Sequence, residues 1–243
     1  MTALVVGASS GLGRALANEL ARRGHALLLV ASDLRDIDAI GADLRIRHGA
    51  TVRSLALDLA READPGARVA AALEGLPPLA SVLLPVGLSR MDDDLGLDAA
   101  RIGELLAINL HAPLAIAHAL LPRLREARGV IVLFSSIAAV RGRGRNVVYA
   151  AAKRGIESLY ESLRQRHRET ELRVQLYRLG FLATNLTHGL ALPMPAAAPD
   201  DVARLVVERL RRGSARWYLP RRFALVAMVV RLLPWPLFRR MQS

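Results

Sequence analysis

The sequence predicts an α/β fold in which helices cover both faces of a doubly wound, parallel sheet of about seven strands. Short apolar runs alternate with longer stretches of helical periodicity along the 243 residues. The runs show no alternation of polar and apolar residues, so both faces of each strand are expected to be covered. A glycine-rich turn directly follows the first run, at the place where such sheets bind ligands.

The order of these segments defines the predicted elements. Apolar runs are predicted to be strands: Ala3–Gly7, Ala26–Ala31, Val52–Leu57, Ala80–Val86, Gly129–Ser135, Arg173–Leu179 and Arg216–Leu219. Stretches with apolar residues three and four positions apart are predicted to be helices: Leu12–Arg23, Arg35–His48, Pro65–Glu74, Asp98–Glu126 and Asn146–Glu169. The segment Gly180–Ala198 is predicted to be a loop over the substrate site, beyond the carboxyl ends of the strands.

The composition narrows the chemistry. The chain has no cysteine, which excludes disulfides, thiolate-bound zinc, iron–sulfur clusters and cysteine nucleophiles. Its histidines show no spacing typical of metal ligands, so no metal site is expected, and His188 is only a candidate contact in the predicted loop. The amino-terminal residues lack the basic and long apolar regions of a signal peptide, which favours a cytoplasmic protein.

The turn after the first predicted strand has the pattern of a dinucleotide site. In such a turn, glycines permit a tight reversal and a close approach of the backbone to pyrophosphate. The amino terminus of the next helix offers unpaired N–H groups to the anion. A glycine-rich turn without a ligand is the alternative. The residues expected to bind the cofactor here are Gly7, Ser9, Ser10, Gly11, Leu12, Gly13 and Arg14.

Residues after the second and third predicted strands bear on the choice of cofactor. A carboxylate at the strand tip suits the ribose hydroxyls of NAD, whereas hydroxyl and guanidinium groups suit the 2′-phosphate of NADP. Ser32 stands at this tip, followed by Asp33 and Arg35. This favours NADP(H) and leaves NAD(H) open. Asp58, followed by Leu59, is expected either to accept a hydrogen bond from the adenine or to cap a helix.

A tyrosine and the only lysine of the chain are spaced for joint chemistry. Tyr149 and Lys153 stand four residues apart, so a helix places them on one face. A phenol must have its pKa lowered from about 10 to about 7 to act as an acid–base catalyst near neutral pH. We predict that the ammonium of Lys153 lowers the pKa of Tyr149 and also binds ribose hydroxyls.

Ser136 after the fifth predicted strand and Asn109 in the long helix complete a set that resembles the classical short-chain dehydrogenase/reductase family over residues 1–220. The resemblance implies a Rossmann-type fold and hydride transfer between a nicotinamide and a carbonyl or alcohol. It also implies a catalytic tetrad. Ser136 orients the carbonyl, Tyr149 donates the proton during reduction, Lys153 holds the nicotinamide ribose, and Asn109 positions a water in the proton relay.

Two segments depart from the family pattern. The family's Asn-Ala-Gly turn after the fourth strand is Pro85-Val86-Gly87 here, and its Pro-Gly after the sixth strand is Leu-Gly. Gly87 keeps the glycine of the first turn, and Thr184 matches the threonine that contacts the nicotinamide carboxamide. Both are therefore expected in the cofactor site, while the loops around the cofactor differ from the usual form.

The carboxyl-terminal residues form a basic and apolar tail. From Arg209 to Ser243 the chain has nine arginines and no acidic residue, within a total net charge of +12. Its apolar run Phe223–Val230 is shorter than the ~20 residues of a membrane span. The segment Phe223–Phe238 is predicted to lie as an amphipathic helix on an anionic membrane. The alternative is packing on the body or on a second subunit.

We therefore predict a catalytic domain, residues 1–220, and a tail, residues 221–243, that attaches the protein to the inner face of the cytoplasmic membrane. Nucleic acid is not an expected partner, because binding to its phosphates has no use for so many apolar residues. The family resemblance implies a homo-oligomer that pairs through the helices Asp98–Glu126 and Asn146–Glu169.

The tail and the run Arg145-Asn146-Val147-Val148 also resemble a narrower group, the reductases of decaprenylphosphoryl-2-keto-ribose. This resemblance implies a keto-sugar on a polyprenyl phosphate as substrate, a flavin oxidase as partner and a role in cell-envelope biosynthesis. Two alternatives remain open. One is a soluble reductase of another hydrophobic ketone or 3-oxoacyl substrate, and the other is a non-catalytic, NADP-binding scaffold at the membrane.

Overall fold

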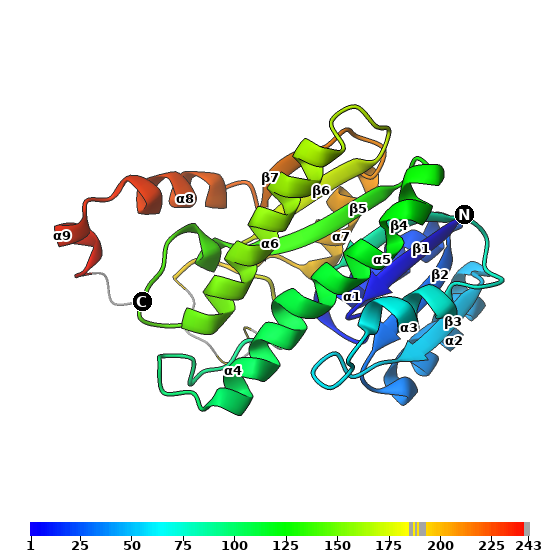
Figure 1. Cartoon of the computed structure of the whole chain (residues 1–243), viewed down its shortest axis with the longest axis horizontal. Coiled ribbons are helices and arrows are strands. Elements are labelled where there is room, and N and C mark those ends of the chain that lie inside the picture. Colours follow the sequence, from blue (N-terminus) through cyan, green and yellow to red (C-terminus); the bar gives the residue numbers. More distant parts are fainter. Residues whose placement is uncertain (185–186, 188, 190–192, 241–243) are drawn as a thin grey trace.

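A computed structural model describes residues 1–184, 187, 189 and 193–240. Seven parallel strands form one sheet in the order β3-β2-β1-β4-β5-β6-β7, which confirms the predicted fold class (Figure 1). The chain order reverses between β1 and β4, and this opens a crevice at the carboxyl ends of the strands. The strands are β1 (Thr2–Val6), β2 (Ala26–Ala31), β3 (Val52–Ala56), β4 (Leu79–Leu84), β5 (Val130–Ser136), β6 (Arg173–Leu179) and β7 (Ala215–Leu219).

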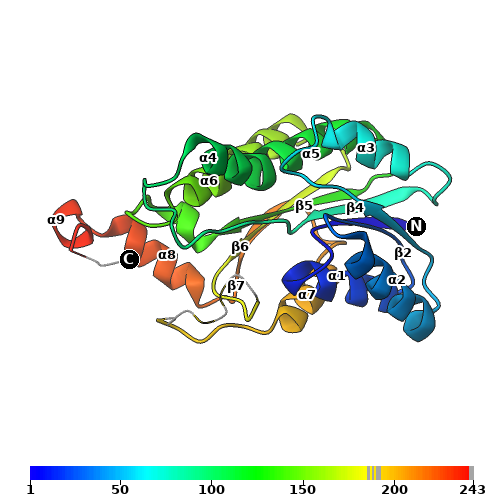
Figure 2. The same cartoon turned by 90° about the horizontal axis from the view of Figure 1, so that it is seen from below.

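Helices cover both faces of the sheet (Figure 2). Successive strand residues point to opposite faces, so Leu4 and Val6 belong to one buried apolar cluster and Ala3 and Val5 to the other. This explains the uninterrupted apolar runs of the sequence. One face carries α1 (Gly11–Arg22), α2 (Leu34–His48) and α7 (Pro199–Glu208), and the other carries α3 (Pro65–Ala72), α4 (Ala99–Leu106), α5 (Ala112–Glu126) and α6 (Val147–Arg166).

The predicted helix Asp98–Glu126 contains a π-helical turn, η1 (Ala107–His111), between α4 and α5. The combined segment is long and apolar enough to cross a membrane by length and composition. Leu105, Ile116 and Leu120 are nevertheless fully buried, so this is a core helix of the fold.

Helix α7 has no counterpart among the predicted helices. It begins at Pro199, and the acidic Asp200 and Asp201 in its first turn suit the positive end of a helix dipole. Val202 and Val206 are buried in the same apolar cluster as the inner side chains of α1. This helix therefore closes the sheet face that α1 and α2 leave open.

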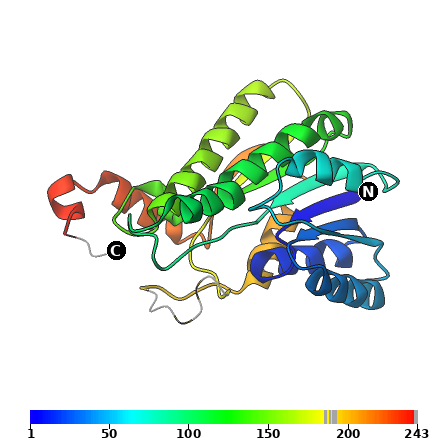
Figure 3. The ribbon, with the colours of Figure 1, turned by 60° about the horizontal axis from the view of Figure 1, so that its bottom comes forward.

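The tail consists of two helices, α8 (Phe223–Leu232) and α9 (Trp235–Phe238), rather than the single helix predicted over Phe223–Phe238. Pro234 is the physical reason, because a proline drives the preceding residue out of helical conformation, and Leu233 is extended with ψ 124°. The tail extends beyond the end of the sheet that carries the crevice (Figure 3).

Several contacts hold the tail to the body. The buried ring of Phe223 occupies the space that a Cβ atom on Gly180 would need, 2.2 Å from two ring atoms. Arg141 follows the short 3-10 helix η2 (Ile137–Val140) and donates hydrogen bonds to the carbonyls of Val230 and Leu233. Its guanidinium also lies 3.9 Å from the ring centroid of Phe238.

Candidate active site

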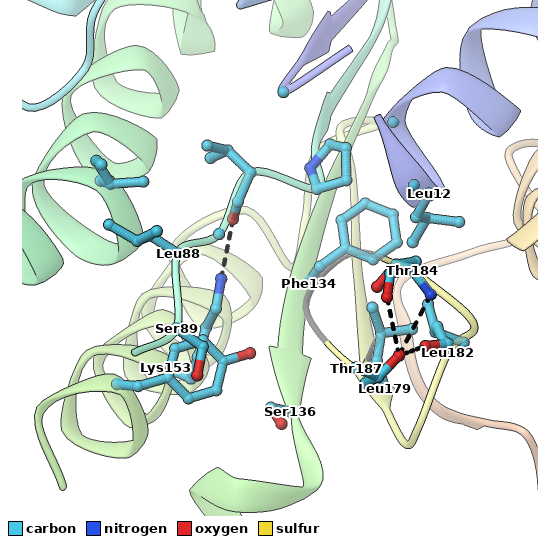
Figure 4. A pocket seen from close by; sticks show the side chains of 18 of the residues that line it. Leu12, Leu88, Ser89, Phe134, Ser136, Lys153, Leu179, Leu182, Thr184 and Thr187 are labelled. Carbon is cyan, nitrogen blue, oxygen red and sulfur yellow. Dashed lines mark hydrogen bonds between the residues drawn. The ribbon is translucent and has the colours of Figure 1, made fainter. Parts of the chain in front are cut away.

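A cavity of about 720 Å³ lies at the carboxyl ends of the strands, at the point where the strand order reverses. Figure 4 shows Lys153 on one side of β5, Thr184 and Thr187 on the other, and Ser136 where the strand ends. Arg14, Asp33, Arg35 and Asn109 are not among the lining residues. The predicted site residues that line the cavity are Gly7, Ser9, Ser10, Gly11, Leu12, Gly13, Ser32, Asp58, Leu59, Gly87, Ser136, Tyr149, Lys153 and Thr184.

The glycine-rich turn has the geometry of a phosphate cradle. Gly7 has a φ of +87°, which side chains disfavour, and a Cβ atom on Gly13 would stand 1.9 Å from the carbonyl oxygen of Gly7. The side chain of Ser10 precedes α1 and accepts no hydrogen bond from the helix, so it does not cap the N–H groups of the first turn. A turn held this closely, beside uncapped N–H donors, fits the pyrophosphate of a nicotinamide cofactor.

Of the predicted ribose contacts after β2, only one lines the cavity. Ser32 lines the cavity, whereas Asp33 caps α2 by accepting the N–H of Arg35 at 2.8 Å. The two side chains also form an ion pair at 3.1 Å, with the Arg35 side chain 91% exposed. Their mutual hydrogen bond holds the pKa of Asp33 below its usual range. Arg14 is exposed on α1.

Asp58 and Leu59 line the cavity after β3. The carboxylate of Asp58 accepts the N–H of Ala60 at 3.0 Å and lies 3.5 Å from the guanidinium of Arg61. Asp58 thus closes a local turn while facing the region expected to hold adenine. On the other side of the cavity, Thr184 lies against Gly11, since a Cβ on that glycine would be 3.0 Å from its methyl group. His188 lies outside the described residues.

Ser136, Tyr149 and Lys153 meet at one end of the cavity. Ser136 ends β5, and α6 presents Tyr149 and Lys153 on the same face. The ammonium of Lys153 lies 5.8 Å from the centroid of the Tyr149 ring and donates a hydrogen bond to the carbonyl of Val86 at 3.0 Å. Lys153 is buried and Tyr149 is half-buried.

Burial dominates the proton affinities of this pair. It raises the pKa of Tyr149, although a hydrogen bond with Ser136 works in the opposite direction. It lowers the pKa of Lys153 to about 8. The pKa of Tyr149 is thus raised rather than lowered, because burial is the largest cause, and the ammonium of Lys153 donates to the carbonyl of Val86. An effect of the Lys153 charge on the phenol stays a prediction.

Asn109 lies in the π-turn η1 and is fully buried. Its side-chain amide donates to the carbonyls of Leu88 at 2.8 Å and Leu105 at 2.9 Å, and its oxygen accepts the N–H of Leu88 at 3.1 Å. A Cβ atom on Gly87 would lie 3.3 Å from this oxygen and 3.4 Å from the Lys153 nitrogen. Asn109 therefore holds the backbone after β4 beside Lys153.

Asp93 has a place in the site that the sequence patterns missed. Its carboxylate is buried and accepts the N–H groups of Val148 and Tyr149, each at 2.9 Å. The residue before α6, Asn146, has left-handed backbone conformation and no capping hydrogen bond from its side chain. Asp93 thus caps α6 from a distant segment and fixes the turn that carries Tyr149. Val148 and Tyr149 lie 55 and 56 positions after Asp93 in the chain, so no sequence spacing could have revealed these hydrogen bonds.

Replacing Asp93 by alanine is expected to lower the free energy of unfolding by about 1–3 kcal/mol, because two buried N–H groups lose their acceptor. It is also expected to lower kcat, since the first turn of α6 frays at Tyr149. Urea denaturation and steady-state kinetics measure the two effects. Asp98→Ala is the control, because Asp98 caps α4 through the N–H of Arg101, and it should leave kcat unchanged. Wild-type stability and kcat in Asp93→Ala would contradict the capping role.

Beneath the site, a buried ion pair connects α6 to β6. Arg178 donates from Nε to Glu157 at 2.6 Å, and a second guanidinium nitrogen contacts the other carboxylate oxygen. Glu157 also accepts the hydroxyl hydrogen of Ser135 at 2.8 Å, and Arg178 donates to Tyr218. The network fixes α6 against the three strands β5, β6 and β7, one helical turn after Lys153.

Comparison with known proteins agrees with this geometry. Residues 1–193 match the family described as short chain dehydrogenase. An uncharacterized oxidoreductase of Myxococcus xanthus (strain DK1622) is 32% identical over 239 residues, which cover 98% of this chain and 94% of the relative. The chain therefore belongs to the short-chain dehydrogenase family, and it is an NAD(P)-dependent oxidoreductase acting on CH–OH and C=O groups.

Two further proteins show the range of the likeness. The 1-deoxy-11-beta-hydroxypentalenate dehydrogenase of Streptomyces exfoliatus is 33% identical over 232 residues, covering 89% of this chain and 81% of that enzyme. A short-chain dehydrogenase from Sphingobium yanoikuyae, solved in complex with NADPH, superposes with a TM-score of 0.84. Its sequence is 26% identical, and the match covers 100% of this chain and 96% of that one.

Proposed function

We propose that the protein reduces a ketone with NADPH and that Tyr149 donates the proton to the carbonyl oxygen. The observation that carries this proposal is the meeting of Ser136, Tyr149 and Lys153 at one end of a cavity whose other end is the glycine-rich cradle. A non-catalytic scaffold would have no need for the three side chains in this arrangement.

Each side chain has a distinct role in the proposed reaction. The hydroxyl of Ser136 donates a hydrogen bond to the carbonyl oxygen, and Tyr149 transfers its phenolic proton to the same oxygen. The bound nicotinamide supplies the hydride that the carbonyl carbon receives. Lys153 binds the ribose next to it, and its positive charge favours the phenolate that remains on Tyr149. Asn109 keeps the backbone after β4 in place and orients a water that returns the proton.

NADPH is expected to bind at least about tenfold more tightly than NADH, because the strand tip offers the Ser32 hydroxyl, and Asp33 is already engaged by Arg35. Fluorescence titration of both cofactors measures this preference. Ser32→Asp places a carboxylate at the strand tip and should reverse the preference for NADPH over NADH. Asp33→Asn is the control and should keep that preference. Tighter binding of NADH to the wild type would mean that Asp33 takes the ribose hydroxyls.

The substrate we propose is a keto-sugar linked to a polyprenyl phosphate, of the decaprenylphosphoryl-2-keto-ribose type. The support is the run from Arg145 to Val148 before Tyr149 together with the basic and apolar tail. A flavin oxidase would supply the keto form, and the alcohol would serve cell-envelope biosynthesis. We propose a homo-oligomer that pairs through α4, α5 and α6. A soluble reductase of another hydrophobic ketone is the second candidate.

Mass spectrometry of lipids that co-purify with the protein tests the substrate proposal. Polyprenyl phosphates carrying a pentose should be enriched with the wild type and displaced by a short prenyl phosphate. The comparison protein is the tail variant Leu225→Gln/Val229→Gln/Leu232→Gln, which should lose the lipids. Fatty acyl thioesters in place of prenyl phosphates would favour a 3-oxoacyl substrate.

We also propose that residues 221–243 attach the catalytic domain to the inner face of the cytoplasmic membrane. Phe223 and Ala227 fix α8 to the body, and this leaves a continuous apolar face in contact with solvent. Its members recur at helical spacing, and arginines flank them, which matches an anionic lipid surface. The large exposed apolar side chains of α8 are Leu225 at 63%, Met228 at 54%, Val229 at 52% and Leu232 at 73%, and those of α9 are Trp235 at 63% and Leu237 at 53%.

The triple variant Leu225→Gln/Val229→Gln/Leu232→Gln is expected to lower binding to anionic vesicles by at least about a hundredfold. Each buried aliphatic side chain contributes about 1.5–3 kcal/mol of transfer free energy. Co-sedimentation with phosphatidylglycerol vesicles, at low and high salt, measures the binding of the wild type and of the variant. Deletion of residues 221–243 is less specific, because it removes Phe223 from its contact with Gly180.

Ile46→Gln is the matched control, since this side chain is 84% exposed on α2 and lies outside the tail. It should leave vesicle binding unchanged. Binding of wild type and triple variant to the same extent would contradict membrane attachment, and a change from dimer to monomer in the triple variant would make the tail a subunit contact.

A further inference from the structure

The substrate end of the cavity is lined by an arginine-rich loop. Residues 141–146 connect η2 to α6, and three of them, Arg143, Arg145 and Asn146, line the cavity with Ser136 and Tyr149. A basic loop beside the reacting groups bears on which ketone the site accepts.

Most arginines near this loop have partners within the protein. Arg141 donates to two carbonyls of the tail, and Arg154 donates to the carbonyls of Ala139 and Val140. Arg90 also lines the cavity, and it pairs with Asp92 at 3.0 Å and with Glu104 at 3.6 Å. The charges of these arginines are therefore committed to holding the fold.

Arg143 differs from these arginines. Its Nε atom is buried and has no hydrogen-bond partner among the residues that the structure describes. Burial alone lowers its pKa, with no neighbouring carboxylate to oppose that effect. A buried guanidinium nitrogen without an acceptor is costly, and such groups in folded proteins nearly always have a partner. The partner expected here is a ligand with acceptor oxygens.

The residues expected to bind the cofactor's phosphates line another part of the cavity. The pyrophosphate cradle is the turn after β1, and the ribose contact Ser32 follows β2. Arg143 comes after β5 and η2 in the chain. In the sheet, β4 lies between β5 and β1. Arg143 is therefore at the end of the cavity where the ketone has to reach Tyr149.

We propose that Arg143 forms an oxyanion subsite for a phosphate group carried by the ketone, with Arg145 adding positive charge at its edge. A guanidinium offers two parallel N–H donors that match two oxygens of a phosphate. The inference rests on the proposed function, since it assigns the anion to the substrate of that reaction. It names the part of the substrate that the protein recognises, whatever sugar or chain is attached.

Calorimetry on the NADPH-saturated protein tests the subsite with geranyl monophosphate and geraniol, which differ only in the phosphate. The wild type should bind the phosphate at least about tenfold more tightly than the alcohol. Arg143→Met should reduce this ratio to less than about twofold, and Arg143→Lys should retain part of it, because lysine keeps the charge without the planar fork. Arg68→Met removes an exposed arginine on α3 and should retain the full ratio.

Inorganic phosphate distinguishes two sources of the anion. If it binds as tightly as geranyl monophosphate, the subsite takes free phosphate or any phosphate ester; if it binds at least tenfold more weakly, the prenyl chain contributes. Either result supports the subsite. Equal binding of geraniol and geranyl monophosphate to the wild type, or an unchanged ratio in a folded Arg143→Met or Arg143→Lys protein, overturns it. These are binding measurements without turnover, so they stand apart from any failure of the reductase proposal.

Discussion

The variant Tyr149→Phe is expected to have a kcat about a hundredfold to ten-thousandfold lower than that of the wild type. This factor is the usual contribution of a positioned general acid. Phenylalanine keeps the ring on α6 and removes only the hydroxyl of a residue that lines the cavity together with Ser136. The affinity for NADPH should change by less than about twofold, since the glycine-rich cradle and Lys153 remain. Single-turnover kinetics of NADPH oxidation and a fluorescence titration separate the two quantities.

Tyr160→Phe is the matched control for this experiment. Tyr160 lies on the same helix, is buried and accepts a long hydrogen bond from Arg164 at 3.4 Å, away from the cavity. Its loss should leave kcat unchanged. Retention of full activity in Tyr149→Phe would refute the proposed proton donor, and loss of NADPH binding would show that the hydroxyl serves the cofactor instead.

The variant Glu157→Leu is expected to lower the free energy of unfolding by about 3–5 kcal/mol, because it leaves the guanidinium of Arg178 buried without its carboxylate. The two side chains are only 5% and 8% exposed. Ser135 also loses an acceptor. Urea denaturation measures the change, and the loss of a fixed α6 should lower kcat as well.

Two further variants define the origin of this effect. Glu157→Leu/Arg178→Met removes both charges and should recover most of the stability, since the cost lies in the unpaired charge. Asp201→Ala breaks the exposed pair with Arg204 on α7 and should change stability by at most about 1 kcal/mol. A double variant no more stable than Glu157→Leu would place the cost in packing rather than in charge.

The sheet and the cofactor turn could be predicted because their signals are local. Strands buried on both faces appear as unbroken apolar runs. A turn whose backbone must approach a phosphate requires glycine at positions 7 and 13. The spacing of Tyr149 and Lys153 likewise follows from one helical turn. Helix α7 had a readable pattern too, with Val202 and Val206 four residues apart.

The remaining features depend on contacts between distant segments. Asp93 resembles its neighbours Asp92 and Asp94 in sequence, and only the fold places its carboxylate at the start of α6. Arg143 is one arginine among many, and its lack of an acceptor becomes visible only when its neighbours are positioned. The pKa of Tyr149 depends on how much water reaches it, which spacing alone does not determine.

The contact between Phe223 and Gly180 restricts how this chain can change over generations. The aromatic ring stands where any side chain at position 180 would begin. Replacement of the glycine therefore requires a smaller residue at position 223, and the change at 223 has to arrive before the change at 180 or together with it. Position 180 begins the segment after β6, and position 223 begins α8. A change at Phe223 thus permits a change at Gly180, which lines the cavity, so the start of α8 and the wall of the cavity are expected to vary together.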